Sequence, residues 1–381
     1  MKGKIIQSFT IKGLFGLYDV HIPFENDVMI LIGENGMGKT QIMNLLYYML
    51  SKDFINLDQS DFAEFYIKFE NHEELKFDNL FNYNNNPVAL KTYLFEYLQG
   101  CEILYLPTYR RIEQSWKKLA HKPTKYPLLN PDLSTNFWEM DDVQKTFDRI
   151  TQAIKNLSRD GLSKMLSEVL INGNSKIGRN FLENIGENDI DIILARVGND
   201  IDSKAKKEVR RIASTKKIQE KDKSLLYFLQ KLVEVYNLQR PLDDSVRRFK
   251  DVCNKYLVNK TLVYDEKRTD IYVKINQDNE PIDLNKLSFG EKQIISIFSK
   301  IYLSSPDSEF VVLIDEPELS LSIFWQRELL PDIYNSGKVR LLFAVTHSPF
   351  IFENELDKYA ISLNEYMKPT TLDLASLADV L

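Results

Sequence analysis

Hydrophobic and polar residues alternate along the first part of the chain, and this period of two predicts β-strands. Residues 4–12 and 18–23 follow the pattern, with two glycines in the short segment between them. We therefore expect an antiparallel hairpin. Residues 62–69 and 73–77 alternate in the same way and predict a second antiparallel pair, turning at residues 71–72.

Continuous apolar runs predict a second kind of strand, which is buried on both faces. There are four such runs, at residues 28–32, 101–107, 310–314 and 340–345. Strands of this kind are typical of parallel sheets that are covered by helices. Helical spacing at residues 40–50 and after Phe289 interleaves with the runs. The chain is therefore expected to have a parallel α/β core.

The middle of the chain has a different character. Residues 141–256 are rich in leucine and charged residues at helical spacing, and Pro241 is the one proline in this segment. This pattern predicts an inserted helical module. We expect an N-terminal lobe at residues 1–140, the helical insertion at 141–256 and a C-terminal lobe at 257–381.

A basic stretch lies inside the predicted insertion. Residues 204–223 contain nine lysines and arginines against three acidic residues. Two interpretations stay open, a solvated helix face or a contact with nucleic acid or an acidic partner. The formal net charge of the whole chain is -6, so nothing global attracts it to nucleic acid or to a membrane.

The segment after the first buried strand carries the phosphate-binding loop pattern Gly-x-x-x-x-Gly-Lys-Thr. Gly33, Gly38, Lys39 and Thr40 occupy its defining positions. Glycines let the backbone approach a ligand closely, so that successive amides cradle an anion. Lys39 can reach the β- and γ-phosphates of a nucleotide, and the hydroxyl of Thr40 can ligate Mg²⁺. The alternative is a plain glycine turn between a strand and a helix.

An acidic pair, Asp315 and Glu316, follows the apolar run at 310–314. Ligands of open α/β sheets bind at the carboxyl ends of the strands, where these carboxylates are expected to emerge. Asp315 is placed to hold Mg²⁺, directly or through water, and Glu316 to polarise the attacking water.

Residues 287–293 read Leu-Ser-Phe-Gly-Glu-Lys-Gln, which resembles the signature of ABC-type ATPases. Ser288 and Gly290 would stand at a helix N-terminus and make a second site for the γ-phosphate. One subunit cannot easily use this site and its own phosphate loop on one nucleotide. The simpler alternative is that Ser288 caps the helix together with Glu291, three residues further on.

His347 follows the last core strand and resembles the switch histidine of ABC-type ATPases, which contacts the γ-phosphate. The alternative is a structural histidine. The order of phosphate loop, signature, acidic pair and histidine resembles ABC-type ATPases. The long insertion before the signature resembles their RecF/SMC-like branch.

Four phrases narrow the resemblance to the OLD-like ATPases of bacterial anti-phage operons, such as the ATPase subunits of Septu and PARIS. They are residues 14–18, 33–36, 105–111 and 315–322. The resemblance covers both ends of the chain well and residues 141–256 poorly.

This resemblance implies an α/β fold with an ABC-ATPase core, in which a mixed or parallel sheet has an antiparallel β subdomain, plus the inserted helical module. It implies an ATPase that converts ATP and water to ADP and phosphate, with ATP and Mg²⁺ as cofactors. The implied catalytic residues are Glu316 and His347, and the implied metal ligands are Thr40 and Asp315. The implied ATP-binding residues are Gly33, Asn35, Gly36, Gly38, Lys39, Thr40, Ser288 and Gly290.

The function implied is that of a sensor and scaffold subunit in a bipartite anti-phage defence complex. Nucleotide-dependent closure of a homo-oligomer, at least a dimer through the signature, would control a separate effector, expected to be a nuclease. The trigger would be nucleic acid or another phage component. OLD nucleases carry a Toprim domain after the ATPase core, and this chain ends about 30 residues past His347, so the effector is expected on another chain. The alternatives are a RecF-like DNA repair ATPase and a scaffold that binds ATP with little turnover.

The cysteines, the hydropathy and the spacing of the motifs bear on the location and the class of this predicted ATPase. Cys101 and Cys253 lack metal-like spacing, and no apolar run approaches the length of a transmembrane helix. We therefore expect a cytoplasmic protein without a membrane partner. A transporter ATPase is disfavoured, because roughly 250 residues separate Lys39 from Ser288. The family's usual metal-contacting glutamine has no clear counterpart, and Gln114 is a weak candidate.

Overall fold

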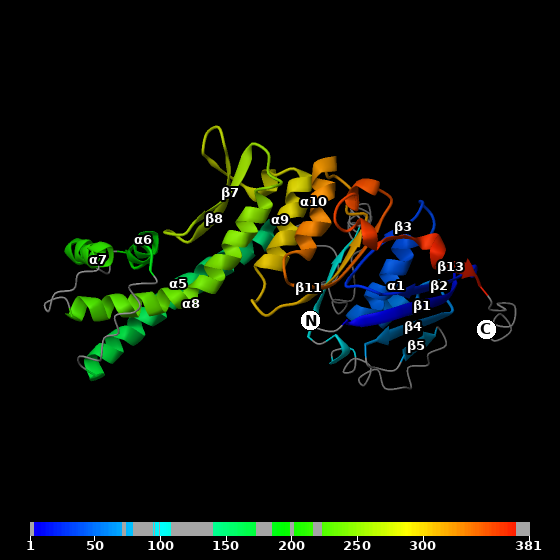
Figure 1. Cartoon of the computed structure of the whole chain (residues 1–381), viewed down its shortest axis with the longest axis horizontal. Helices are drawn as coiled ribbons and strands as arrows, with labels where there is room; N and C mark the ends of the chain where they lie inside the picture. Colours follow the sequence, from blue (N-terminus) through cyan, green and yellow to red (C-terminus); the bar gives the residue numbers. More distant parts are fainter. Residues whose placement is uncertain are drawn as a thin grey trace, which may run out of the picture. The chain divides into compact units, whose positions relative to one another are not determined.

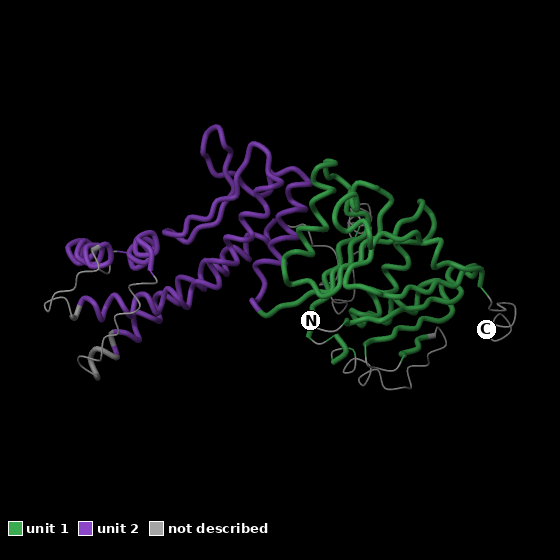
Figure 2. Tube along the Cα trace, viewed as in Figure 1, with its two compact units in different colours: residues 1–137, 307–381 green, residues 138–306 purple. Residues whose placement is uncertain are grey.

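The structure is a computed structural model of the whole chain. It describes residues 4–70, 74–78, 94, 96–98, 100–107, 140–172, 185–198, 202–215 and 223–370. The chain forms two compact units, which Figure 2 shows in different colours. Unit 1 comprises residues 1–137 and 307–381, and unit 2 comprises residues 138–306.

A five-stranded parallel sheet forms the core of unit 1 (Figure 1). Its strands, in order across the sheet, are β12 (Ala360–Ser362), β3 (Val28–Ile32), β11 (Val339–Thr346), β10 (Phe310–Asp315) and β6 (Glu102–Leu106). Every residue of β10 is buried, as expected for a strand covered on both faces. The four strands predicted from the apolar runs are confirmed.

A second sheet of unit 1 is antiparallel. Its strands, in order across the sheet, are β13 (Met367–Pro369), β2 (Tyr18–Pro23), β1 (Ile6–Leu14), β4 (Glu64–Phe69) and β5 (Glu74–Asp78). Both predicted antiparallel pairs are confirmed. The turn expected at residues 71–72 lies outside the described residues.

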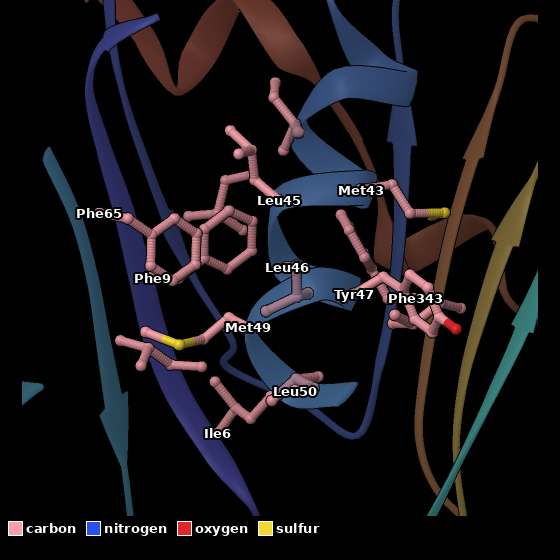
Figure 3. Close-up of a cluster of buried hydrophobic side chains, with 14 of the residues drawn as sticks. Ile6, Phe9, Met43, Leu45, Leu46, Tyr47, Met49, Leu50, Phe65 and Phe343 are labelled. Atoms are coloured by element: carbon pink, nitrogen blue, oxygen red, sulfur yellow. The ribbon is translucent and has the colours of Figure 1, made fainter. Parts of the chain in front are cut away.

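Helix α1 (Lys39–Ser51) lies between these two sheets (Figure 3). Leu45 and Met49 point toward Phe9 of the antiparallel sheet, while the ring of Tyr47 packs against Tyr105 of the parallel sheet, with ring centroids 4.4 Å apart. These side chains belong to one hydrophobic cluster, in which all but the partly buried Tyr105 are buried. The apolar side chains surround α1 because both of its sides face a sheet. The packing fixes the start of α1, which is the phosphate-loop end.

The remaining helices of unit 1 are shorter. Helix α2 (Phe54–Asp58) follows α1, and α10 (Ile323–Tyr334) stands between β10 and β11. Ser322 caps α10 by accepting a hydrogen bond from the amide of Trp325. Because the cap satisfies a free amide of the first helical turn, it favours a helix that begins directly after the turn that leaves β10.

Two long helices, α5 (Met140–Asn172) and α8 (Lys223–Cys253), run antiparallel in unit 2. Phe147 stacks edge-on against Phe249 near one end of the pair, with ring centroids 5.7 Å apart. Further along, the side-chain amide of Gln239 donates to the carbonyl oxygen of Ile154 at 3.0 Å. Gly161 lies where an added Cβ would approach the side chain of Val235 within 2.2 Å, so the helices are in close contact there.

Helices α6 (Glu187–Arg196) and α7 (Ser203–Thr215) pack with α8 around a hydrophobic cluster of their own. An ion pair between Arg196 and Asp243, 2.7 Å apart, is almost fully buried beside this cluster. These four helices confirm the helical character predicted for residues 141–256. Residues 216–222 of the basic stretch lie outside the described part of the chain.

Three of the five basic side chains of α7 have partners within unit 2. Arg210 pairs with Asp191 at 2.9 Å, and Arg211 pairs with Glu208 at 2.7 Å. Lys206 donates to the carbonyl oxygen of Gly198. These contacts favour the interpretation of α7 as a structural and solvated helix. A contact with nucleic acid or an acidic partner stays a prediction.

Unit 2 also contains a three-stranded antiparallel sheet and a further helix. These elements are β7 (Lys260–Asp265), β8 (Asp270–Ile275), β9 (Pro281–Ile282) and α9 (Phe289–Tyr302). From the sequence these elements are expected in a C-terminal lobe at residues 257–381, whereas their contacts group them with the helices of residues 138–306. The boundaries at 140 and 256 stay predictions.

Candidate functional site

The phosphate-binding loop connects β3 to α1 in unit 1. Gly36 and Gly38 have φ angles of 89° and 87°, in the left-handed region that favours glycine. A Cβ on Gly38 would lie 2.8 Å from the ring of Phe15. Gly38 also occupies the N-cap of α1 and offers no side-chain cap. The first amides of α1 therefore remain available to an anion such as a nucleotide phosphate.

Lys39 is buried at the start of α1, with 4% of its surface exposed. Its ammonium donates to the carbonyl oxygens of Gly33 at 2.6 Å and Glu34 at 2.8 Å. Burial lowers the pKa of Lys39 from its ordinary value, and the negative charge of Glu316 acts in the opposite direction. A phosphate would give this ammonium a charged acceptor in place of neutral carbonyls, which is a stronger hydrogen bond.

The hydroxyl of Thr40 donates to Oδ1 of Asp315 at 3.0 Å. Asp315 ends β10 and is 2% exposed. Hydroxyl and carboxylate oxygens are hard ligands of the kind that Mg²⁺ prefers, and Mg²⁺ is commonly bound through one or two protein ligands together with nucleotide phosphates. The two residues thus fit the metal role predicted for them.

Glu316 directly follows Asp315 and has a φ angle of 49°. This left-handed conformation of a non-glycine residue costs about 1–3 kcal/mol and persists only where the surroundings hold it. The amide of Glu316 donates to the carbonyl oxygen of Val345 at 2.9 Å, which provides part of that support. Its side chain is 19% exposed, so the carboxylate can contact water.

His347 lies beside two carboxylates. Its Nδ1 is 3.8 Å from Oε1 of Glu316 and 3.0 Å from Oε1 of Glu318. Of the two carboxylates, Glu318 is therefore the nearer partner of His347. Glu318 is not among the residues predicted from the motifs, although it lies in the phrase at residues 315–322. The sign of Glu318 in the sequence is an acidic residue two positions after the acidic pair.

The signature residues belong to unit 2 and form a capping box at the start of α9. The hydroxyl of Ser288 accepts from the amide of Glu291 at 3.4 Å, and the amide of Ser288 donates to the Glu291 carboxylate at 2.8 Å. Lys260 of β7 donates to both oxygens of that carboxylate, at 2.8 and 3.0 Å. Gly290 is the second residue of α9 and is buried. The capping role of Ser288 is thus observed, and its role toward another subunit's nucleotide stays a prediction.

Unit 1 therefore brings most of the predicted site residues together at one edge of the parallel sheet. These residues are Gly33, Asn35, Gly36, Gly38, Lys39, Thr40, Asp315, Glu316 and His347. Gln114 and residues 108–111 lie outside the described part of the chain. Within the described ranges, no cluster of three or more His, Cys, Asp or Glu residues could hold a metal ion.

The family described as AAA ATPase domain matches residues 5–352. This chain therefore belongs to the AAA ATPase domain family. Among curated proteins, none matches the chain.

Two solved structures are similar over most of the chain. One is the Smc head domain with an extended coiled coil bound to the C-terminal domain of ScpA, derived from Pyrococcus furiosus, at 14% identity, covering 98% of each chain, with a TM-score of 0.45. The other is the Smc head domain with a coiled coil and joint, derived from Pyrococcus yayanosii, also at 14% identity and 98% of each chain, with a TM-score of 0.42. These scores are too low to support a statement about function.

The predicted fold class is confirmed. The α/β core of unit 1 has a parallel sheet with an antiparallel β subdomain, and a helical module is inserted between β6 and β10. None of the described helices is both long enough and apolar enough to span a membrane.

Replacing Lys39 by alanine should weaken binding of ATP with Mg²⁺ by about 10- to 100-fold. The substitution removes a charged hydrogen bond worth about 1.5–3 kcal/mol. Calorimetric titration with a non-hydrolysable ATP analogue measures the affinity. Lys12→Ala is the matched control, because Lys12 lies on β1 in a partly exposed pair with Glu64. Equal affinities of Lys39→Ala and the unaltered protein would refute the assignment of the loop.

Proposed function

We propose that this chain binds ATP with Mg²⁺ and hydrolyses it to ADP and phosphate. The observation that carries the proposal is the 3.0 Å hydrogen bond between Thr40 and Asp315. It joins the phosphate-binding loop to the acidic pair, so that the phosphate site, the metal ligands and the carboxylate of Glu316 are neighbours. A plain glycine turn that binds no ligand would not require this hydrogen bond, nor a glutamate in the costly left-handed conformation beside it.

Each residue has a defined part in the proposed reaction. The loop amides and Lys39 hold the phosphates, and Thr40 and Asp315 are the ligands offered to Mg²⁺, which would neutralise charge on the β- and γ-phosphates. Glu316 orients the attacking water and accepts its proton. His347, when protonated, donates from Nε2 to the γ-phosphate.

The proposed assembly is a homo-oligomer in which the start of α9 of one copy closes on the nucleotide of another. Ser288 and Gly290 stand at the N-terminus of a 14-residue helix, where the amides and the helix dipole favour an anion. This proposal depends on the resemblance of residues 287–293 to the ABC signature.

The finer function that we propose is a cytoplasmic sensor and scaffold subunit of a bipartite anti-phage defence complex. ATP-dependent closure would hold or release a separate effector, a nuclease. The support for this proposal is the resemblance of four phrases to OLD-like ATPases. A RecF-like repair ATPase shares most of these motifs, and gene neighbourhood distinguishes the two, because an adjacent nuclease gene favours defence.

Glu316→Gln should bind ATP with nearly unchanged affinity and hydrolyse it about 10²- to 10⁴-fold more slowly, because an amide cannot accept the proton of the attacking water. Steady-state phosphate release measures turnover, and titration with ATP measures affinity. Turnover at the unaltered rate would remove Glu316 from the catalytic role. Absence of turnover in the unaltered protein, with ATP bound, would favour the ATP-locked scaffold.

Two substitutions of Ser288 separate the signature role from the helix cap. Ser288→Arg should prevent ATP-dependent closure in a Glu316→Gln background, and so should Ser288→Asp, which keeps a good N-cap but repels a phosphate. Size-exclusion chromatography with and without ATP measures the closed assembly. Closure that persists in both variants would show that Ser288 is only a cap.

The defence role predicts a stable complex with a protein encoded beside this chain. Co-expression of the neighbouring genes, followed by affinity purification, should recover that protein at constant stoichiometry. The isolated chain should hydrolyse ATP and leave DNA and RNA intact. Metal-dependent cleavage by the isolated chain, abolished by substitution of its own acidic residues, would contradict the division of labour.

A further inference from the structure

Glu318 carries a buried negative charge that the roles assigned so far do not use. It lies in the turn that leaves β10, and its side chain is 5% exposed. Among the described residues, no lysine or arginine forms an ion pair with it, and its Oε2 has no hydrogen-bond partner. Lys39 acts on it electrostatically but forms no ion pair with it. Burying a carboxylate without an ion-pair partner is unfavourable, so the contacts that Glu318 does make are the ones that explain its place.

Those contacts both involve His347. Oε1 of Glu318 accepts from the backbone amide of His347 at 3.1 Å and lies 3.0 Å from its Nδ1. A carboxylate oxygen and a ring nitrogen without a hydrogen would repel each other at 3.0 Å, so this contact favours a hydrogen on Nδ1. In the neutral ring, Nε2 is then the nitrogen without a hydrogen. The ring is 41% exposed, which leaves Nε2 as the atom that a ligand can reach.

A second set of hydrogen bonds holds the two turns together. The amide group of Gln326, on α10, donates to the carbonyl oxygen of Leu321 at 3.0 Å. Its oxygen accepts from the hydroxyl of Ser348 at 2.8 Å. The turn that contains Glu318 and the turn that contains His347 are thus linked at two places, and the orientation of the imidazole is set by more than one contact.

We propose that Glu318 is a positioning residue that holds His347 in the Nδ1–H tautomer and thereby presents Nε2 to the nucleotide phosphates. The inference rests on the proposed ATP hydrolysis for its consequence but not for its geometry. The two glutamates then have separate tasks. Glu316, which is partly exposed, acts on water, and Glu318, which is buried, acts on His347.

The tautomer can be measured directly on the whole chain without nucleotide. Long-range ¹H–¹⁵N correlation spectra of protein labelled with ¹⁵N-histidine distinguish the two nitrogens in the neutral ring, at alkaline pH. The chain has four histidines, and the loss of one set of signals in His347→Gln assigns the ring. We expect the Nδ1–H tautomer in the unaltered protein and a shift toward Nε2–H in Glu318→Gln. A ring of His347 that is mainly Nε2–H in the unaltered protein would overturn the proposal.

A double-mutant cycle on ATP turnover tests the consequence. Glu318→Gln should lower kcat about 10- to 100-fold, the range of effects seen when the partner that orients a functional histidine is removed, with KM for ATP changed less than about twofold. In a His347→Gln background the same substitution should change kcat less than about twofold, since two residues that act as one unit are not additive. Equal effects of Glu318→Gln in both backgrounds would overturn the proposal.

Glu353→Gln is the matched control. Glu353 is an exposed glutamate of unit 1 that pairs with Arg327, and its replacement should leave both the tautomer and kcat unchanged. If the unaltered protein shows no turnover, the proposed function fails and the spectra alone decide the role of Glu318.

Discussion

The hydrogen bond between Thr40 and Asp315 is the contact on which the candidate site depends. It joins residues that are 275 positions apart in the chain. The register of the parallel sheet makes this possible, because Ile32 of β3 is level with Thr346 of β11, and Asp315 of β10 is level with Val345. Three strands therefore end together at one edge. The phosphate loop, the acidic pair and His347 each follow one of these ends, so a shift in register would separate all three.

Much of this arrangement could be predicted from the sequence. The apolar runs identified β3, β6, β10 and β11, because strands buried on both faces leave a continuous hydrophobic pattern. The motifs placed Lys39, Asp315 and His347 at strand ends, and parallel strands bring such ends together. That His347 follows the last of these strands could also be seen from the sequence, whereas its place beside the catalytic carboxylate was implied by the resemblance to the ABC switch histidine.

The role of Glu318 could not be predicted in the same way. It depends on the path of the turn after β10, where Glu316 and Ser320 both have left-handed φ angles. Such conformations of non-glycine residues are rare, and no residue pattern in this turn predicts them. The grouping of β7, β8 and α9 with the helices of residues 138–306 also has no signal in the residue pattern. The alternation of polar and apolar residues shows which face of a strand is buried, but it does not show which unit that face packs against.

The balance of charge at the site explains why a metal ion is central to the account. Asp315, Glu316 and Glu318 all interact electrostatically with Lys39, a single buried lysine. An ATP molecule adds further negative charge, which this acidic surrounding opposes unless a cation enters with it. The most direct test compares the affinity for ATP with and without Mg²⁺ in the unaltered protein and in Asp315→Asn, which keeps an acceptor for Thr40. The account predicts that Mg²⁺ strengthens binding at least about tenfold, or about 1.4 kcal/mol, in the unaltered protein and not in the variant. An Asp315→Asn protein that keeps the full effect of Mg²⁺ would contradict it.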